Sequence, residues 1–370
     1  MQPIKTQDLI QQHLEILRKL EYKSGLFAAS KKDSTTGYDK AWLRDNFYTC
    51  LAFEFSGDWQ TVKQVYRAIL DIFIKHEYKI DAALEEKPKH GYEYLHPRYH
   101  PETFDEFWED WGFKQHDSIG AILFKIGELE AKGTKILETK DDKRVIQKLV
   151  QYLDKIMYWA DPDNGIWEED EELHASSIGA CLAGLKMIKK YTDVDVSQEL
   201  IEKGEKILHH LLPRESKRKF VDLALLSLIF PYNVVTPKER DEILQHVEYH
   251  LLRGHGLIRY KNDHYYNKNP DGYSEEAEWC FGFSWLAIIY SILGNEKYYE
   301  YYLQKAKETI NPEGDIPELY YSNTDKYNEN SPLGWAESLF IVALYHLNKK
   351  SIAEVLPDYA QMRLKSYVGS

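Results

Sequence analysis

The chain has 370 residues, with 47 Lys and Arg against 60 Asp and Glu, and its formal net charge is −13. That balance argues against a nucleic-acid partner, because phosphate binding depends on clustered Lys and Arg. Hydrophobic residues make up 43% and Gly and Pro are few, so the chain is globular and long enough for one large domain or two ordinary ones. Tyr outnumbers Phe by 28 to 14, an excess of rings with a polar tip.

The three cysteines, Cys50, Cys181 and Cys280, are far apart and odd in number, so they predict neither a disulfide framework nor a zinc site. The first twenty residues mix charged and amide side chains in an amphipathic pattern, unlike a secretory signal. The longest apolar stretches, Leu223–Phe230 and Phe281–Leu293, are too short to span a bilayer. We therefore expect a cytoplasmic protein without membrane contact.

Helical periodicity dominates the chain. Apolar residues recur at spacings of three and four, as at Val62, Val65 and Ile69, and Thr236 followed by Pro237 is typical of a helix start. About twelve helices are expected, near 5–21, 41–55, 59–85, 116–132, 141–159, 173–190, 197–212, 217–230, 237–252, 276–293, 295–310 and 331–348. No run of alternating strands appears and no Gly/Ser linker divides the chain, which predicts one all-α domain over 1–350 and a short tail over 351–370.

Charged, amphipathic helices alternate along the chain with more apolar or small-residue helices. A helix that is apolar on most sides must be covered on most sides, so the alternation predicts an inner ring of six helices inside an outer ring of six. The irregular segments are 22–40, 86–115, 160–172, 253–275 and 311–330, and each precedes an inner helix. We expect them to gather at one end of the ring around a central pocket.

Two stretches of the chain combine Trp with charged residues. Arg44 and Asp45 beside Trp42 could present a guanidinium fork, a carboxylate and a stacking face to one polyol, although an ordinary ion pair at a helix start fits as well. Trp108 and Trp111 stand in an irregular stretch, where a Trp usually needs a wall to lie on. Packing of a long loop onto the ring is the alternative there.

The acidic run after the Asn164-Gly165 turn is the third candidate. Trp167 places an apolar wall next to Glu168, a setting that favours the protonated carboxyl of a general acid. A solvated acidic face is the ordinary alternative, and the Asp spacing does not fit a calcium-binding EF-hand. Further along, Glu318 is a lone acid among apolar and aromatic neighbours, which is a weak signal by itself.

Several other chemistries are excluded by pattern. Gly254 and Gly256 resemble a dinucleotide loop, but Arg259 stands where its third glycine belongs and no βαβ unit surrounds it. The histidines have no Cys partners and no His-Glu-x-x-His pattern, so surface or hydrogen-bonded roles are expected of His96, His100, His209 and His210. No metal and no cofactor is therefore expected.

Taken together and in this order, five segments resemble glycoside hydrolase family 15, which holds the glucoamylases and the related toroidal domain of phosphorylase kinase alpha and beta subunits. The matching residues are Trp42-Leu43-Arg44-Asp45, Trp111-Gly112 with Gln115 and Asp117, Trp167-Glu168-Glu169, Gly256–Tyr260, and Ile316-Pro317-Glu318 with Pro332-Leu333-Gly334-Trp335. Each motif is short, but five in order over residues 25–345 are specific.

The resemblance implies an (α/α)6 toroid and inverting hydrolysis of a terminal α-glucosyl bond, with release of β-glucose. Carried over by position, Glu168 is the general acid and Glu318 the general base. The expected substrate-binding residues are Arg44, Asp45, Glu169 and Arg259 around the terminal glucose, Trp42, Trp111, Trp167 and Trp335 as walls, Tyr38 beneath the reacting sugar, and Asp117 by its place in the second motif.

Two other interpretations stay open. Trp42–Asn46 and His174–Ser177 read closer to the phosphorylase kinase branch, and Leu319 replaces the polar residue that many members carry after the base. A catalytically silent, carbohydrate-binding or regulatory domain is therefore the main alternative. An unrelated (α/α)6 lyase or epimerase is a third, which would be expected to show a His or Tyr in place of the glutamate pair. Linkage, aglycone and oligomeric state are left open by the sequence.

Overall fold

The computed structural model describes residues 5–109, 111–267 and 275–345, and nearly all of its regular structure is helical. The α-helices are α1 (Thr6–Leu20), α2 (Leu43–Ser56), α3 (Trp59–Lys75), α4 (Glu77–Glu85), α5 (His116–Ala131), α6 (Lys140–Ile156), α7 (Ala175–Tyr191), α8 (Gln198–Leu211), α9 (Pro237–Leu251), α10 (Phe281–Ile292), α11 (Glu296–Lys307) and α12 (Gly334–Leu344). Two short 3-10 helices, η1 (Gly91–Glu93) and η2 (Leu223–Leu228), and four two-residue strands, β1 (Ala41–Trp42), β2 (Arg98–Tyr99), β3 (Glu278–Trp279) and β4 (Leu319–Tyr320), complete it.

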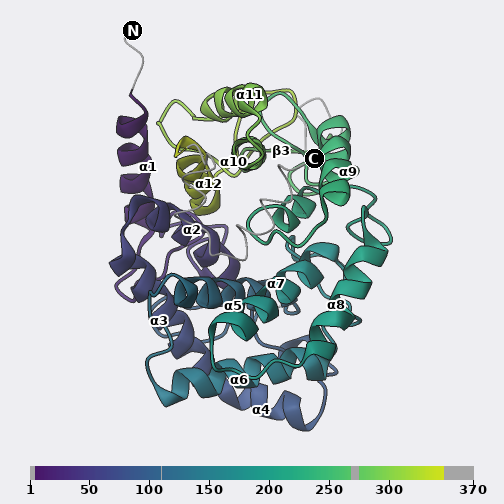
Figure 1. Ribbon diagram of the computed structural model, residues 1–370. Helices are drawn as coiled ribbons and strands as arrows, with labels where there is room; N and C mark the ends of the chain where they lie inside the picture. Colours follow the sequence, from purple (N-terminus) through teal and green to yellow (C-terminus); the bar gives the residue numbers. More distant parts are fainter. Residues whose placement is uncertain (1–4, 110, 268–274, 346–370) are drawn as a thin grey trace.

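The helices form two layers. Nearly every residue of α2, α5, α7, α10 and α12 is buried, whereas α1, α3, α6, α8, α9 and α11 each bury one face. The wholly buried η2 takes the sixth inner place, in contact with α7, α9 and α10, and α12 closes the ring by packing on α1 and α2. The helices follow one another around the molecule in Figure 1. The predicted (α/α)6 toroid is confirmed.

Some helix boundaries differ from those expected. The predicted helix 59–85 is two helices, because His76 leaves helical geometry and its Nε2 bonds the carbonyl of Phe104 at 2.7 Å. The predicted α-helix 217–230 is only the 3-10 helix η2, since the Leu223 N–H bonds the distant Arg259 carbonyl and Pro231 follows. The helix predicted from 276 begins at Phe281, after β3. The predicted tail 351–370 lies outside the described residues.

Close packing of α5 on α7 fixes where two of the loops begin. A Cβ on Gly120 would lie 2.3 Å from the backbone nitrogen of Cys181, and one on Gly184 would lie 2.6 Å from the Gly120 carbonyl. Only glycine permits this approach, because any side chain would force the helices apart. The starts of α5 and α7, after the segments that carry Trp111 and Glu168, are thereby held side by side.

Short ladders tie the remaining loops together at one end of the ring. In β1–β2, Trp42 stands opposite Arg98, and in β3–β4, Trp279 stands opposite Leu319. Within the residues that the structure describes, no helix is long and apolar enough to cross a membrane.

Candidate active site

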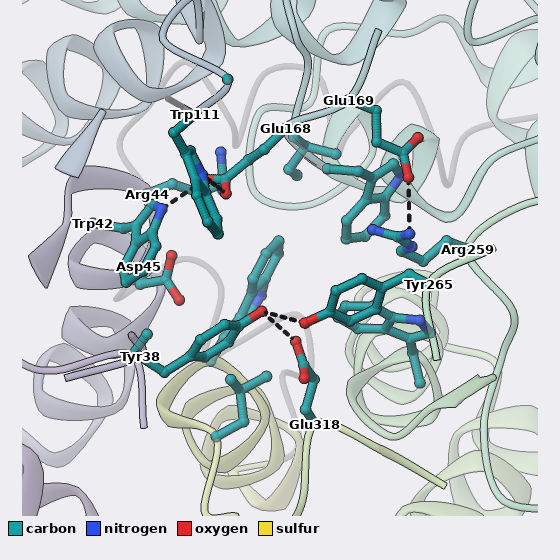
Figure 2. A pocket seen from close by; sticks show the side chains of 17 residues that line it. Tyr38, Trp42, Arg44, Asp45, Trp111, Glu168, Glu169, Arg259, Tyr265 and Glu318 are labelled. Carbon is teal, nitrogen blue, oxygen red and sulfur yellow. Dashed lines mark hydrogen bonds and ion pairs between the residues drawn. The ribbon is translucent and has the colours of Figure 1, made fainter. Parts of the chain in front are cut away.

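A pocket of about 340 Å³ opens at the end of the ring where the loops meet (Figure 2). Its lining comes from all five irregular segments and the helix starts that follow them, as the sequence predicted. The residues are Ala29, Tyr38, Trp42, Arg44, Asp45, Trp111, Gly112, Ile166, Trp167, Glu168, Glu169, Arg259, Tyr265, Trp279, Glu318, Leu333 and Trp335. Aromatic faces edged with carboxylates and guanidinium groups suit a sugar ring, which offers CH groups and hydroxyls.

Glu168 is held by N–H donors on both carboxylate oxygens. Oε1 accepts from Trp42 Nε1 at 2.7 Å and from Arg44 Nη2 at 3.0 Å, and Oε2 accepts from Trp111 Nε1 at 2.5 Å. The backbone here is strained, because Glu168 has a φ of +63°, which is uncommon outside glycine. Gly165, in the same turn, has a φ of +64° and lies against His174, where a Cβ would meet the ring at 2.8 Å.

Arg44 lies in the first turn of α2 and links three segments. Its Nη1 donates to Gln115 Oε1 at 2.8 Å and to Asp117 Oδ2 at 3.2 Å, while Nη2 reaches Glu168. Asp117 is buried behind Arg44 and does not line the pocket. The Trp-Gly-x-x-Gln-x-Asp motif therefore supplies the groups that orient the Arg44 guanidinium.

Glu169 points away from Glu168, into a separate ion-pair network (Figure 2). Arg259 Nη2 donates to Glu169 Oε1 at 2.8 Å, and Lys219 Nζ and the Tyr260 hydroxyl donate to Oε2 at 2.8 and 2.6 Å. The pKa of Glu169 is lowered, because these cations and hydrogen bonds outweigh the effect of burial. Asp263 accepts from Nε and Nη2 of Arg259, both at 2.6 Å, which fixes that guanidinium at the pocket wall.

Glu318 is fully buried and held by neutral donors. The Tyr38 hydroxyl donates to Oε1 at 2.8 Å, and the side-chain amides of Asn328 and Asn330 donate to Oε2 at 2.6 and 2.8 Å. The Tyr265 hydroxyl lies 2.9 Å from that of Tyr38 and extends the chain of hydroxyls. Burial raises the pKa of Glu318, and the three hydrogen bonds oppose that rise.

Asp45 projects into the pocket between Trp42 and Tyr38 (Figure 2). Burial raises its pKa to about 7, with Arg44 acting against the rise and the charges of Glu168 and Glu318 adding to it. Asp45 therefore changes its protonation state close to neutral pH.

Stacked aromatic rings form an apolar part of the lining. The Trp335 ring lies on Phe281 at 4.7 Å and on Tyr48 at 4.2 Å between centroids, nearly parallel to both. Trp167 stacks on Trp335 at 6.3 Å and donates its Nε1–H to Asp222 at 2.7 Å. The Trp167 ring thus packs with this stack, while the nearest partners of Glu168 are polar.

All the predicted site residues except Asp117 line the pocket, and their roles stay predictions. Trp108, expected beside it, is fully exposed to solvent. Tyr265, Asn328 and Asn330 also contribute to the site, and no sequence pattern predicted them. Tyr265 lies in a segment that was singled out, but its pattern does not distinguish it from Tyr266, and isolated Asn residues carry no periodic or motif signal. Across the described parts of the chain, no group of three or more His, Cys, Asp or Glu could hold a metal ion.

Comparisons with known proteins show which sequences and folds this chain resembles. Over 379 residues the chain is 27% identical to the phosphorylase b kinase regulatory subunit alpha of Oryctolagus cuniculus skeletal muscle, covering 82% of this chain and 30% of that protein. The chain thus spans about a third of the length of the curated relatives it matches.

Two solved structures show the same fold. A glycosidase variant in complex with glucose superposes with a TM-score of 0.78 at 18% identity, covering 95% of this chain and 96% of that one. A bacterial glucoamylase complexed with acarbose gives a TM-score of 0.73 at 16% identity, covering 98% and 58%. A family model described as glycosyl hydrolases family 15 matches residues 5–341, and the chain therefore belongs to that family.

Proposed function

We propose that the chain is an inverting, exo-acting α-glucoside hydrolase that releases β-glucose from the non-reducing end of an α-glucoside or short α-glucan. The observation that carries the proposal is the pair Glu168 and Glu318, which face one pocket from opposite sides (Figure 2). Two carboxyl groups flanking a sugar are what inverting hydrolysis requires, at a separation of roughly 6.5–9.5 Å that admits a water. Two structures of similar fold, one in complex with glucose and one with acarbose, support a glucoside as the ligand of this pocket.

The proposed reaction uses the two glutamates in opposite directions. Glu318 takes a proton from water, whose oxygen attacks the anomeric carbon on the face opposite the leaving group. Glu168 gives its proton to the glycosidic oxygen as the bond from carbon to that oxygen breaks. The new C–OH bond has inverted configuration, and exchange with solvent returns the proton from Glu318 and reprotonates Glu168.

The other lining groups have roles that fit a terminal sugar. The Asp45 carboxyl and the Arg259–Glu169 pair offer hydrogen bonds to hydroxyls on different sides of the cavity. The stacked rings that include Trp335 lie against the space where the CH groups of a pyranose would sit. In this proposal the pocket of about 340 Å³ holds the terminal sugar of an exo-acting hydrolase.

The test is proton NMR of the purified protein with a panel of α-linked glucosides that includes maltose, isomaltose and trehalose. We expect β-glucose to appear first and α-glucose to follow by mutarotation. Release of α-glucose first would rule out inversion, and absence of turnover with every glucoside would rule out the hydrolase.

A catalytically silent, sugar-binding or regulatory domain is the second candidate. It is favoured by the curated relatives, which are regulatory subunits of phosphorylase b kinase. Isothermal titration with the same glucosides separates the two candidates, because a silent domain binds sugar and returns it unchanged. Hydrolysis that stops in both Glu168→Gln and Glu318→Gln would instead support the enzyme.

A further inference from the structure

Arg98 is a buried cation next to the pocket that no sequence motif singled out. It stands opposite Trp42 in the β1–β2 ladder and is 1% exposed. Its guanidinium carbon lies 4.0 Å from the centroid of the Trp111 ring and 5.4 Å from that of Trp42. These two indoles are the ones whose N–H groups donate to Glu168.

We propose that Arg98 is a positioning residue, which fixes the Trp42 and Trp111 indoles so that their N–H groups hold the Glu168 carboxyl in its working orientation. Arg98 does not line the pocket, so it acts through the two rings and not by touching a sugar. The proposal rests on the proposed function, because it assigns a catalytic consequence to this geometry.

The first argument is the strength of the contact between Arg98 and the rings. A guanidinium stacked on an indole is attracted by the negative face of the ring, and the attraction is larger when water is excluded. Burial lowers the pKa of Arg98 while the charges of Glu168 and Glu109 oppose that change, and an arginine stays protonated in either case.

The second argument is the way Arg98 ties down the segment that carries Trp111. Trp111 lies outside any helix or strand, so its own backbone gives it little support. Glu109, two residues earlier, accepts on Oε2 from Arg98 Nη2 at 2.8 Å and from Lys40 Nζ at 2.6 Å. Lys40 also lies 4.3 Å over the Phe107 ring. Arg98 thus holds this segment both through the Trp111 ring and through Glu109.

The experiment compares Arg98→Leu, Arg98→Lys and a matched control, Arg18→Leu. Arg18 also stacks on a ring, 4.4 Å from the Phe53 centroid, but lies on α1 outside the pocket. For Arg98→Leu we expect kcat to fall about 100-fold, the loss typical of a displaced catalytic group. KM should change less than about threefold, because the groups proposed to bind the sugar are untouched. Arg98→Lys should recover part of kcat, and Arg18→Leu should match the native protein.

A second readout does not depend on turnover. The Trp111 indole N–H signal in proton–nitrogen correlation spectra, assigned with Trp111→Phe, should move in Arg98→Leu and in Glu168→Gln but not in Arg18→Leu. If the native protein hydrolyses nothing, the proposed function fails, and this signal still tests whether Arg98 positions Trp111.

Two results would overturn the proposal. One is an Arg98→Leu protein with kcat within about twofold of native, since a positioning residue must affect the chemical step. The other is an unmoved Trp111 signal in that variant. If Arg98→Leu fails to fold, Glu109→Gln is tested instead. We expect this variant to lose less kcat and to show the same shift of the Trp111 signal. If neither kcat nor the signal changes, the proposal for Arg98 is wrong.

Discussion

The two glutamates of the pocket lie in opposite kinds of surroundings. The Glu168 side chain is 13% exposed and receives N–H groups only, one of them from the cation Arg44, with a second cation, Arg98, close behind. Glu318 is 1% exposed and receives only neutral donors, one hydroxyl and two amides. One carboxyl accepts a hydrogen bond from a cation, whereas the other is more deeply buried and accepts from neutral groups.

The sequence predicted an apolar wall beside Glu168 and gave only a weak signal for Glu318. In the structure Trp167 packs into the ring stack and donates to Asp222, and the hydrogen bonds to Glu168 come from Trp42, Arg44 and Trp111. Burial raises the pKa of Glu318. For a general base that change is useful, since a carboxylate with a higher pKa takes a proton more readily while it stays ionised at the working pH.

The largest expected effect separates the two glutamates by chemistry. Glu168→Gln and Glu318→Gln should each lower kcat by about 10²–10⁴ on a natural glucoside, the range for loss of a general acid or base. On an activated glucoside, such as an aryl glucoside with a good leaving group, Glu168→Gln should recover much of its rate, because the leaving oxygen no longer needs a proton. Glu318→Gln should not recover. Steady-state kinetics on both substrates measure this.

The same pair of variants can reverse the assignment. Recovery of Glu318→Gln with the activated substrate, and not of Glu168→Gln, would make Glu318 the acid. Circular dichroism of both proteins serves as the control for folding, and equal recovery of both variants would mean that neither residue has a role specific to the leaving group.

A smaller effect is expected from removing one neutral donor to Glu318. In Asn330→Ala the lost hydrogen bond no longer lowers the pKa of Glu318, so that pKa rises further. The acid limb of the kcat/KM profile should then move to higher pH, with the rate on that limb lower by about tenfold, the value of one hydrogen bond to a charged group. Rates measured from pH 4 to 8 test the shift.

A matched control for Asn330→Ala is Thr36→Val. The Thr36 hydroxyl donates to Asn330 Oδ1 at 2.6 Å and does not touch Glu318. Its loss should leave the acid limb in place. An equal shift in both variants would show that general loosening of the loop, and not the amide donor, controls Glu318.

The fold could be predicted almost entirely because its signals are periodic. Amphipathic helices alternate with apolar ones, and the width of the apolar surface of each helix indicates how much of that helix is buried. There are two exceptions. The segment 217–230 forms only the 3-10 helix η2, since the Leu223 N–H bonds the Arg259 carbonyl and Pro231 follows. The bond from His76 to the Phe104 carbonyl accompanies the break in the predicted helix 59–85. Both helix boundaries depend on a contact with a residue distant in sequence or on a single turn, and hydrophobic periodicity predicts neither.

The site residues that belong to motifs could be predicted from the sequence. The residues that support them without lining the pocket could not. Trp42, Arg44 and Glu168 belong to short specific patterns. Arg98 and Asn330 are single residues in loops, and only the β1–β2 ladder and the Glu318 hydrogen bonds reveal their positions. The hydrogen-bond partners in a charged network depend on which segments fold against one another. The sequence therefore predicted which residues share the pocket but not which of them pair.

Loss of the Tyr265 hydroxyl should lower activity less than loss of an amide donor to Glu318. Tyr265 contacts Tyr38, whose hydroxyl in turn donates to Glu318. Tyr265→Phe removes one hydrogen bond between neutral groups, so we expect kcat to fall only about threefold to tenfold. Tyr266→Phe is the matched control, because the Tyr266 hydroxyl bonds Glu329 instead. A loss as large as that of Glu318→Gln would make Tyr265 part of the proton path.

The smallest expected effect concerns Asp45, whose pKa is raised in part by the charges of Glu168 and Glu318. Its pKa is about 7 against an ordinary value of 3.8, so the folded protein holds it protonated over a range in which the unfolded chain does not. Its contribution to the free energy of unfolding is therefore present below about pH 4 and lost as the pH rises through 7.

Asp45→Asn should remove both consequences of that titration. In the native protein the ionised carboxylate accepts sugar hydroxyls more strongly than the neutral acid, so KM should fall about threefold as pH rises through 7. In Asp45→Asn, KM should stay level between pH 6 and 8. The melting temperature of the variant should gain on the native protein at pH 8 compared with pH 4. A native KM that is flat over this range would mean that Asp45 does not exchange its proton in the sugar complex, and that the charges of Glu168 and Glu318 do not set its state there.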